Sequence, residues 1–442
     1  MDKPEFDSVA NSVDRRDFLR LCTTTAAAVG LGAAAIVDTA MAASPATAAD
    51  PAFWYGAVYF RKSNPPEKDW ARDHKAAAEA GINIMRHWFV WGAIEVAPGK
   101  YDWRDYDRMM ELEAQNHIRT VIAELITMAP EWAYNAYPPA RVVTREGETA
   151  GSMMSGSSAT GALRLCLDND AFRAKAGEFL KALALRYRDH PSMYGYDLWN
   201  ECNETACYCP STAAKFRAWL QKKYGTLEDL AKIWHRYSYD TWENISPPRG
   251  AGPWPDWIDW AEFREDNAYE HLRWRRDIIR SVDTKNHVVA HGIAATLHSL
   301  PDHVANDWRA AAEVETYGFT WVVSRHGNAP WQQFQAVDLV RSASRGKPFW
   351  HAEQQGGPLW LQPQVIGHPL EGGRKPDAKD LRVWDMTSFA LGVSGLFYVR
   401  FRPLLDGPLF GAFGPWGLDG LATPRSDMVA ALAKWTGANP EV

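Results

Sequence analysis

The feature that most constrains the fold is a regular alternation of short apolar runs with longer amphipathic segments, which starts near residue 52. The apolar runs read as strands at residues 53–60, 82–87, 118–125, 193–199, 288–291, 313–319, 348–352 and 395–400. The clearest helical patterns cover residues 68–80, 106–116, 169–188, 213–224, 256–282 and 379–391. Eight strands that alternate with helices predict an α/β fold, a (β/α)8 TIM barrel with insertions in its loops.

A doubly wound sheet would produce the same alternation, but no Gly-x-Gly-x-x-Gly turn follows the first strand candidate. Beyond the N-terminal segment, no internal repeat or Pro/Gly-rich linker divides the chain. We therefore expect residues 51–442 to form one catalytic barrel domain.

Composition narrows the function classes only a little. The chain has 46% hydrophobic and 23% charged residues, which is typical of a globular protein with a large core. Its net charge of -6 gives no basic surplus for nucleic acid, and no segment is apolar enough to span a membrane. The 22 tryptophans can stack on sugar rings, although most of them are expected to fill the core. Composition thus favours a carbohydrate substrate weakly.

Residues 1–50 differ in composition from the rest and resemble an export signal. Arg15-Arg16 stands before Phe-Leu and an Ala/Gly-rich apolar stretch at 26–37, and small-residue cleavage patterns follow. This stretch of about a dozen residues is too short to cross a bilayer. We expect a twin-arginine (Tat) signal, a mature chain that starts near residues 43–51, and a secreted or extracytoplasmic protein.

Two glutamates stand where the chemistry of such a barrel belongs, directly after strand candidates. Glu201 follows Asn200 at the end of the fourth run, and Glu353 follows the seventh run. A second Asn-Glu pair at 203–204 lies farther into the loop. A single glutamate at a strand end is usually a solvated residue or an ion-pair partner, but two at matching ends favour a shared site.

Two carboxylates that face each other across a barrel mouth suit retaining glycoside hydrolysis. One must be protonated to donate to the leaving oxygen, and the other must be ionised to attack the anomeric carbon. Their separation should be about 5–5.5 Å. Glu201 and Glu353 are therefore the predicted catalytic pair.

Several motifs follow one another in a fixed order between residues 53 and 435. They are Asn-Ile-Met-Arg at 83–86 with Phe-Val-Trp-Gly-Ala-Ile-Glu at 89–95, Tyr-Asp-Trp at 101–103, Ala-Pro-Glu-Trp at 129–132, His-Pro to Asn-Glu at 190–201, Phe-Arg-Ala-Trp-Leu at 216–220, Lys-Tyr-Gly-Thr at 223–226, Glu-Gln-Gln at 353–355 with Trp360, and Tyr-Val-Arg-Phe-Arg at 398–402. Together these motifs resemble the glycoside hydrolase family 42 β-galactosidases.

The resemblance implies a role for each matching residue. Glu201 would be the acid/base and Glu353 the nucleophile of a double displacement through a covalent glycosyl-enzyme. Arg86 would bond the nucleophile and keep it ionised, the alternative being an ion pair at the barrel floor. The other implied sugar-pocket residues are Asn200 at the 2-hydroxyl, Tyr317 on the sixth strand and Trp360 as a wall, for which core packing is the alternative.

Three departures from the family limit what the resemblance implies. Phe413 and Trp416 stand where the family has a Glu and a His that hold the galactose hydroxyls, so we expect a site that stacks on its sugar. The sugar could then be an α-L-arabinopyranoside, a β-glucoside or an oligosaccharide, and a non-catalytic sugar-binding barrel is the alternative from another class. Ala162 replaces a family arginine, with Arg164 as a shifted candidate. The chain ends after the eighth helix, so the oligomeric state is left open.

Four cysteines follow the export signal: Cys166, Cys202, Cys207 and Cys209. By resemblance, three of them match zinc thiolates of part of the family, with Thr212 at the fourth position and Cys202 as its replacement. The outcomes left open are a closed structural zinc site and a disulfide between Cys166 and a loop cysteine. A catalytic metal is not expected because thiolate-rich sites are normally closed, and catalysis should need no cofactor.

Overall fold

The computed structural model describes residues 51–62, 64–123, 126, 128–150, 152–153, 162–163, 165–202, 206–250, 252, 254–294, 305–326, 329–358, 376–405, 411 and 413–440. The predicted export signal, Arg164 and Trp360 lie outside these residues, as does the side chain of Ala162. In the described part, no helix is long and apolar enough to cross a bilayer.

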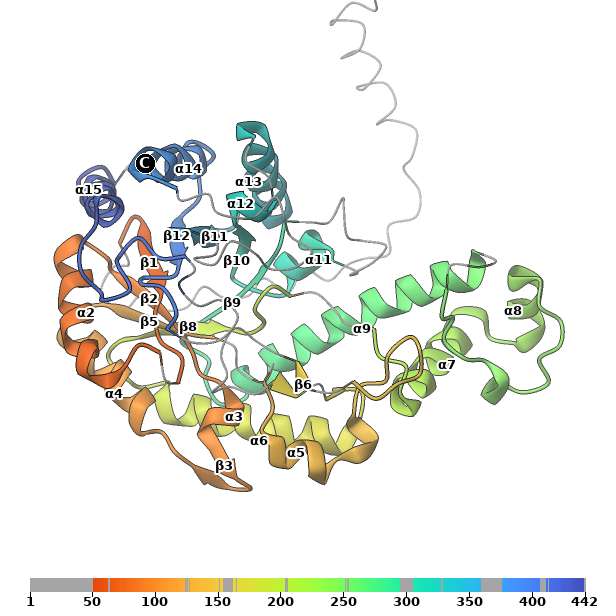
Figure 1. Ribbon diagram of the computed structural model, residues 1–442. Coiled ribbons are helices and arrows are strands. Elements are labelled where there is room, and N and C mark those ends of the chain that lie inside the picture. Colours follow the sequence, from red (N-terminus) through yellow and green to blue (C-terminus); the bar gives the residue numbers. More distant parts are fainter. Residues whose placement is uncertain are drawn as a thin grey trace, which may run out of the picture. The chain divides into compact units, whose positions relative to one another are not determined.

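Eight parallel strands close into a barrel in the order β1-β12-β11-β10-β9-β8-β5-β2 (Figure 1). They are β1 (Trp54–Val58), β2 (Ile84–Trp88), β5 (Arg119–Ala123), β8 (Met193–Asp197), β9 (His287–Gly292), β10 (Thr316–Trp321), β11 (Phe349–Gln355) and β12 (Gly395–Val399). Every strand candidate read from the sequence overlaps one barrel strand, so the predicted (β/α)8 fold is confirmed.

Helices surround the barrel, one after each strand. They are α2 (Glu67–Ala80), α4 (Arg104–Gln115), α6 (Asp170–Tyr187), α9 (Pro255–Arg280), α11 (Asp307–Ala312), α13 (Pro330–Ser344), α14 (Ala378–Ala390) and α15 (Pro424–Ala438). The helix α2 ends at Gly81, whose φ of 91° and backbone bonds to Ala77 and Ala78 form the left-handed cap expected there.

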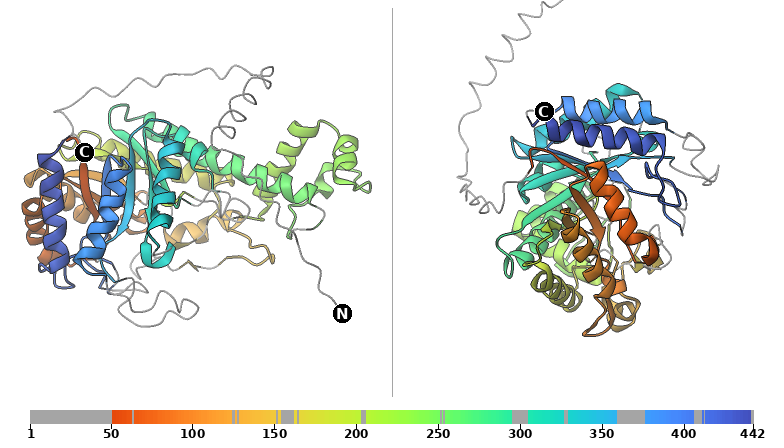
Figure 2. Two further views of the ribbon diagram at one scale, coloured as in Figure 1. Left: turned by 90° about the horizontal axis from the view of Figure 1, so that it is seen from above. Right: turned by 90° about the vertical axis from the view of Figure 1, so that its left-hand side faces the viewer.

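Shorter elements lie in the loops. They are α3 (Trp91–Ile94), β3 (Glu95–Ala97), β4 (Lys100–Tyr101), α5 (Glu131–Ala136), the 3-10 turns Pro138–Ala140 and Trp242–Asn244, β6 (Ser152–Met153), β7 (Ala162–Leu163) and α12 (Val323–His326). The largest insertion follows β8, where α7 (Pro210–Tyr224) and α8 (Leu227–Trp234) pack against the far end of α9. Figures 1 and 2 show this extension projecting beside the barrel, and it has its own core around Phe216, Trp234 and Trp260.

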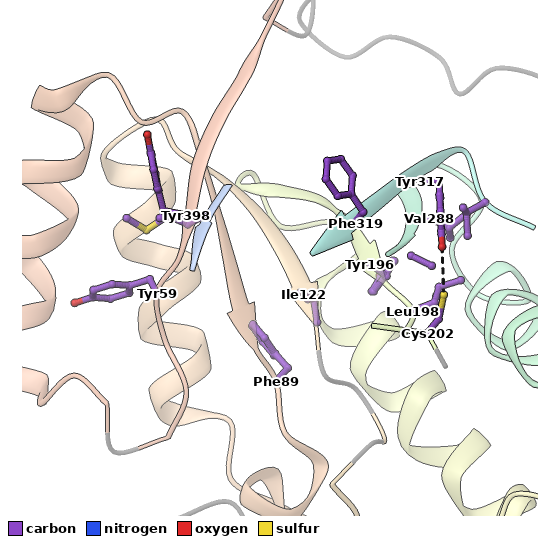
Figure 3. Close-up of a cluster of buried hydrophobic side chains, with 14 of the residues drawn as sticks. Tyr59, Phe89, Ile122, Tyr196, Leu198, Cys202, Val288, Tyr317, Phe319 and Tyr398 are labelled. Carbon is purple, nitrogen blue, oxygen red and sulfur yellow. Dashed lines mark hydrogen bonds between the residues drawn. The ribbon is translucent and has the colours of Figure 1, made fainter. Parts of the chain in front are cut away.

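The barrel strands separate two apolar layers because successive side chains point to opposite faces. Inside the barrel, a floor is formed by Trp54, Ile84, Val121, Tyr194, Val289, Trp350 and Phe397. The larger core lies between strands and helices, and Figure 3 shows part of it, including Ile122, Tyr196, Val288 and Phe319. Polar side chains that point inward beyond the floor therefore face the carboxyl-terminal mouth of the barrel.

Candidate active site

The candidate site begins one layer beyond the apolar floor, toward the carboxyl ends of the strands. Ile84 on β2 and Val289 on β9 belong to the floor. Two residues farther along, Arg86 and His291 point to the same interior face because side chains repeat with a period of two. Asp197 pairs with Val289 in the β8–β9 register and also faces inward. These strands therefore bring buried charged and polar groups to the barrel mouth.

Glu353 reaches the same layer because β11 contains a bulge. Trp350 belongs to the interior floor, so simple alternation would point a residue three positions later outward. The register against β10 runs from Phe319 opposite His351 to Thr320 opposite Glu353, which inserts one extra residue into β11. A bulge of this kind reverses the faces of the residues that follow it. Glu353 consequently points into the barrel, where Arg86 meets it.

Arg86 holds the site together through three contacts, although only 2% of the residue is exposed. Its Nη1 lies 2.7 Å from Glu353 Oε1 and its Nε lies 2.8 Å from Asp197 Oδ2. Its Nη2 donates to Asn200 Oδ1, on the residue that precedes Glu201. The predicted contact between Arg86 and Glu353 is therefore present, and it lies at the mouth rather than the floor of the barrel.

His291 forms a second link between the two predicted catalytic residues. Its Nε2 accepts the backbone N–H of Glu201 at 3.2 Å and lies 3.9 Å from Glu353 Oε1. Because Nε2 accepts, the ring proton is on Nδ1, which donates to Asp197 Oδ2 at 2.9 Å. Burial by itself would raise the pKa of Asp197, but His291 and Arg86 hold that pKa below its ordinary value.

Glu201 thus follows β8, the fourth barrel strand, and Glu353 lies near the carboxyl end of β11, the seventh, so both stand on the strands that the sequence predicted. Asp197 and His291 were not predicted as site residues. Each is a polar residue at an inward-facing position near the end of a strand that otherwise presents apolar side chains inward. Parity identifies His291, two positions after Val289, but not Asp197, because β8 has one extra residue between Met193 and Gly195 and Asp197 stands three positions after the inward-facing Tyr194.

Tyr317 does not point into the barrel, which corrects the expectation for the sixth strand. It is flanked on β10 by Thr316 and Gly318, and its ring lies in the core between strands and helices (Figure 3). Its hydroxyl donates to Asp307 Oδ1 at 2.8 Å and lies 3.9 Å from Cys202 Sγ. The physical reason is the period of two along β10, which places Tyr317 on the outer face of the strand, toward the helices.

The two aromatic residues expected to stack on the sugar occupy different environments. Phe413 packs with Val58, Val399 and half-buried Trp88, which stand at the mouth ends of β1, β12 and β2. Trp416 instead stacks on the fully buried ring of Phe401, with centroids 4.0 Å apart, and 4% of it is exposed. This stacking packs Trp416 against the core around Phe401, and a sugar contact stays a prediction for both Phe413 and Trp416.

Three of the four cysteines form a buried cluster beside the barrel. The sulfur atoms of Cys166, Cys207 and Cys209 lie within 4.8 Å of one another. Thr212 Oγ1 lies 3.3 Å from Cys166 Sγ and 3.4 Å from Cys209 Sγ. The Cys166 and Cys207 thiols lower the pKa of Cys209 by hydrogen bonding, so this group favours a thiolate. The cluster thus supplies three of the four donor atoms that a structural zinc ion takes.

Cys202 does not belong to this cluster, which corrects its expected role as the fourth ligand. Its sulfur contacts the Tyr317 hydroxyl in the core around β10. Its backbone N–H bonds the His291 carbonyl at 2.7 Å, which anchors the residue after Glu201 to β9. Thr212 lies beside the cluster instead, and its hydroxyl donates to Asp168 at 2.6 Å.

Comparisons with known proteins agree with the barrel fold and indicate one family. β-Galactosidase Bga of Halorubrum lacusprofundi is 28% identical over 377 residues, which cover 80% of this chain and 51% of that protein. The β-galactosidase of Thermus thermophilus is 26% identical over 370 residues, covering 78% and 54% of the two chains. The solved structure of the polyextremophilic β-galactosidase from Halorubrum lacusprofundi superimposes with a TM-score of 0.73 at 25% identity, covering 87% of this chain and 58% of the other.

The chain spans about half the length of the curated relatives it matches, 51% in the case of Bga. The model of glycoside hydrolase family 42, described as beta-galactosidase, matches residues 59–407. That range includes both glutamates, Arg86, Asp197 and His291. With its closed barrel and a glutamate at the carboxyl end of each of the fourth and seventh strands, the chain belongs to glycoside hydrolase family 42.

Proposed function

We propose that this protein is a retaining glycoside hydrolase that removes terminal β-linked sugars by double displacement. The observation that carries the proposal is the Arg86 guanidinium, which bonds Glu353 with one nitrogen and Asn200, next to Glu201, with another. One cation thus ties the two carboxyl-bearing segments to a single barrel mouth. Membership in family 42 and the names of the β-galactosidase relatives support the same reaction.

In the first step, a Glu353 carboxylate oxygen attacks the anomeric carbon while the Glu201 carboxylic acid gives its proton to the leaving oxygen. The bond to the leaving group breaks and a glycosyl ester forms on Glu353. In the second step, Glu201 removes a proton from water, the water oxygen attacks the anomeric carbon, and Glu353 leaves as a carboxylate. Arg86 keeps Glu353 oriented throughout, and Asn200, which Arg86 also contacts, would bond the sugar 2-hydroxyl as the family resemblance implies.

The sugar that enters the site is proposed to be a galactoside or a related pyranoside. Phe413, Val58, Val399 and Trp88 form an apolar edge of the mouth, which suits the hydrophobic face of a pyranose. Such an edge discriminates poorly among hydroxyl configurations, because it makes no hydrogen bonds to them. The proposed alternatives are therefore α-L-arabinopyranosides, β-glucosides and short oligosaccharides.

A panel of nitrophenyl glycosides tests this proposal with wild type, Glu201→Ala and Glu353→Ala. We expect wild type to release nitrophenol from at least one β-glycoside and Glu353→Ala to lose turnover. Azide should restore Glu353→Ala activity and give a glycosyl azide of inverted configuration. Wild-type protein that binds sugars but cleaves none of the panel would identify a sugar-binding barrel instead.

We also propose that Cys166, Cys207 and Cys209 hold a structural zinc ion, with Thr212 and a water molecule as candidates for the fourth position. Zinc would crosslink the loop after β8 to the segment before α6 and would take no part in the chemistry. Metal analysis of the purified protein together with thiol titration tests this. We expect about one zinc per chain and thiols that react after chelation, whereas a disulfide would give no zinc and two fewer thiols.

Export through the twin-arginine pathway is proposed from the Arg15-Arg16 pair and the apolar stretch that follows it. Sequencing the amino terminus of the exported protein should find a start near residues 43–51. Replacing both arginines by lysine should leave the protein inside the cell, and unchanged export of that variant would refute the proposal.

A further inference from the structure

Glu201 has a backbone conformation that needs support from its surroundings. Its φ of 46° lies in the left-handed region, which a non-glycine residue occupies at an energetic disadvantage. The next residue, Cys202, is bonded to the His291 carbonyl at 2.7 Å, and the Glu201 N–H is bonded to His291 Nε2 at 3.2 Å. His291 therefore contacts both peptide units that define where the Glu201 side chain starts.

The imidazole can accept the Glu201 N–H only in one protonation state. The proton must be on Nδ1, so that the lone pair of Nε2 faces the Glu201 backbone. Asp197 Oδ2 fixes this tautomer by accepting from Nδ1 at 2.9 Å. His291 is fully buried and Asp197 is 2% exposed, and the two residues lie on adjacent barrel strands, so packing holds the imidazole and the carboxylate in place.

The same Asp197 oxygen also orients the nucleophile through Arg86. Arg86 Nε lies 2.8 Å from Oδ2, and this contact turns the guanidinium so that Nη1 reaches Glu353 Oε1 at 2.7 Å. One oxygen atom is thus the common acceptor of two chains of contacts. One chain runs through His291 to the Glu201 backbone, and the other runs through Arg86 to the Glu353 carboxylate.

We propose that Asp197 and His291 are positioning residues that set the distance and orientation of the two glutamates relative to each other. This inference rests on the proposed retaining reaction. The His291 branch controls how well Glu201 delivers its proton, because a shift of about 1 Å in a catalytic group can lower the rate about 10²-fold. The Arg86 branch controls the approach of Glu353 to the anomeric carbon.

A matched pair of substitutions separates the two contacts of His291, the one to the Glu201 N–H and the one to Asp197. In His291→Gln, the side-chain amide oxygen can take the place of Nε2 and accept the Glu201 N–H. In His291→Asn, the shorter amide can replace Nδ1 beside Asp197 but offers nothing to Glu201. Both variants remove the ring, and Asn leaves more empty space than Gln by one methylene group; a packing defect should lower the rate on every substrate equally, so the dependence on the leaving group is the quantity compared.

The measurement is kcat/KM for aryl glycosides whose leaving groups range from 2,4-dinitrophenol, which departs without a proton, to phenols that need one. We expect His291→Gln to stay within about tenfold of wild type for the whole series. We expect kcat/KM of His291→Asn to fall about 10²-fold on the poorest leaving group and far less on the dinitrophenyl substrate. Glu201→Ala, which lacks the proton donor, should show the same dependence on the leaving group. A loss that is equal across the series in both variants would overturn the proposal.

Asp197 provides an independent test if a His291 variant fails to fold. In Asp197→Asn, one amide oxygen can still accept from both His291 and Arg86, so the leaving-group dependence should stay near that of wild type. Asp197→Ala removes the shared acceptor and should make the rates depend on the leaving group as steeply as in His291→Asn. Equal dependence in these two variants would refute the positioning role, whereas a wild type inactive on every glycoside would refute the proposed function itself.

Discussion

Replacing Tyr317 by phenylalanine tests whether this residue belongs to the active site or to the surrounding core. The substitution removes one hydroxyl and retains the ring. The family resemblance implies a place for Tyr317 in the sugar pocket, whereas the structure directs its hydroxyl to Asp307 at 2.8 Å on the helix side of β10. The two interpretations predict opposite effects on stability and activity.

The expected magnitude follows from the environment of the lost hydrogen bond. Tyr317 and Asp307 are each 2% exposed, and burial together with Asp307 raises the pKa of Tyr317 well above its ordinary value. The hydroxyl is therefore a neutral donor to a buried carboxylate. Hydrogen bonds to charged groups contribute about 1.5–3 kcal/mol, so we expect the free energy of unfolding to fall by about that amount.

Urea denaturation and steady-state kinetics check this expectation on the same preparations. We expect Tyr317→Phe to unfold at lower urea and to keep kcat/KM within about twofold of wild type. Tyr196→Phe is a matched control, because the Tyr196 hydroxyl donates to buried Asp283 at the same distance of 2.8 Å and also faces the helices. A loss of kcat of about 10²-fold in Tyr317→Phe alone, with unchanged stability, would refute the outward placement of Tyr317.

Three further substitutions have defined outcomes. Asp168→Asn should lower the free energy of unfolding by about 3–5 kcal/mol at pH 7: burial by itself would raise the pKa of this carboxyl, but donors from α7 and α9 outweigh burial and hold the pKa below its ordinary value. In urea titrations the deficit should shrink as the pH falls below about 4, where the unfolded chain also binds this proton. Burial raises the Asp385 pKa to about 7, so between about pH 4 and 7 this carboxyl loses its proton in the unfolded chain but keeps it in the folded one, and wild type loses stability as the pH rises. Asp385→Asn should remove this loss. Parallel pH–stability curves for the two proteins would contradict the expectation. Gly318→Ala would place a methyl group 2.9 Å from Ala352 Cβ and 3.0 Å from His291 Cβ. It should lower the free energy of unfolding by about 1–3 kcal/mol and should also lower kcat. Calorimetry and kinetics that match wild type would show that the neighbouring side chains move to make room for the methyl group.

Much of the architecture could be predicted from local patterns. The period of apolar residues distinguishes strands from helices, and eight alternations leave few folds other than a closed barrel. Gly81 ends α2 where the sequence indicates, because a left-handed cap is a property of a few consecutive residues. Counting strands was sufficient to assign Glu201 and Glu353 to the fourth and seventh, since it requires only order along the chain.

Which way a side chain faces was decided by the tertiary structure. Glu353 points inward only because β11 has one extra residue relative to both neighbouring strands. The residues near 353 contain no pattern that predicts this bulge. Tyr317 faces outward for the related reason that its position on β10 is set by pairing with β9 and β11. Register is a relation between strands far apart in the sequence, so a local pattern does not contain it.

The sequence by itself determined the barrel, the order of its strands and the presence of two glutamates at their ends. The tertiary structure decided which groups surround those glutamates. Cys202 lies beside Tyr317 in the core and not in the cysteine cluster, and Trp416 stacks on Phe401. Asp197 and His291 link Arg86 to the backbone of Glu201. The contacts of His291 with Glu201 and of Asp197 with His291 and Arg86 join residues 90 to 111 positions apart, and they exist only because the closed barrel brings the strand ends to one mouth.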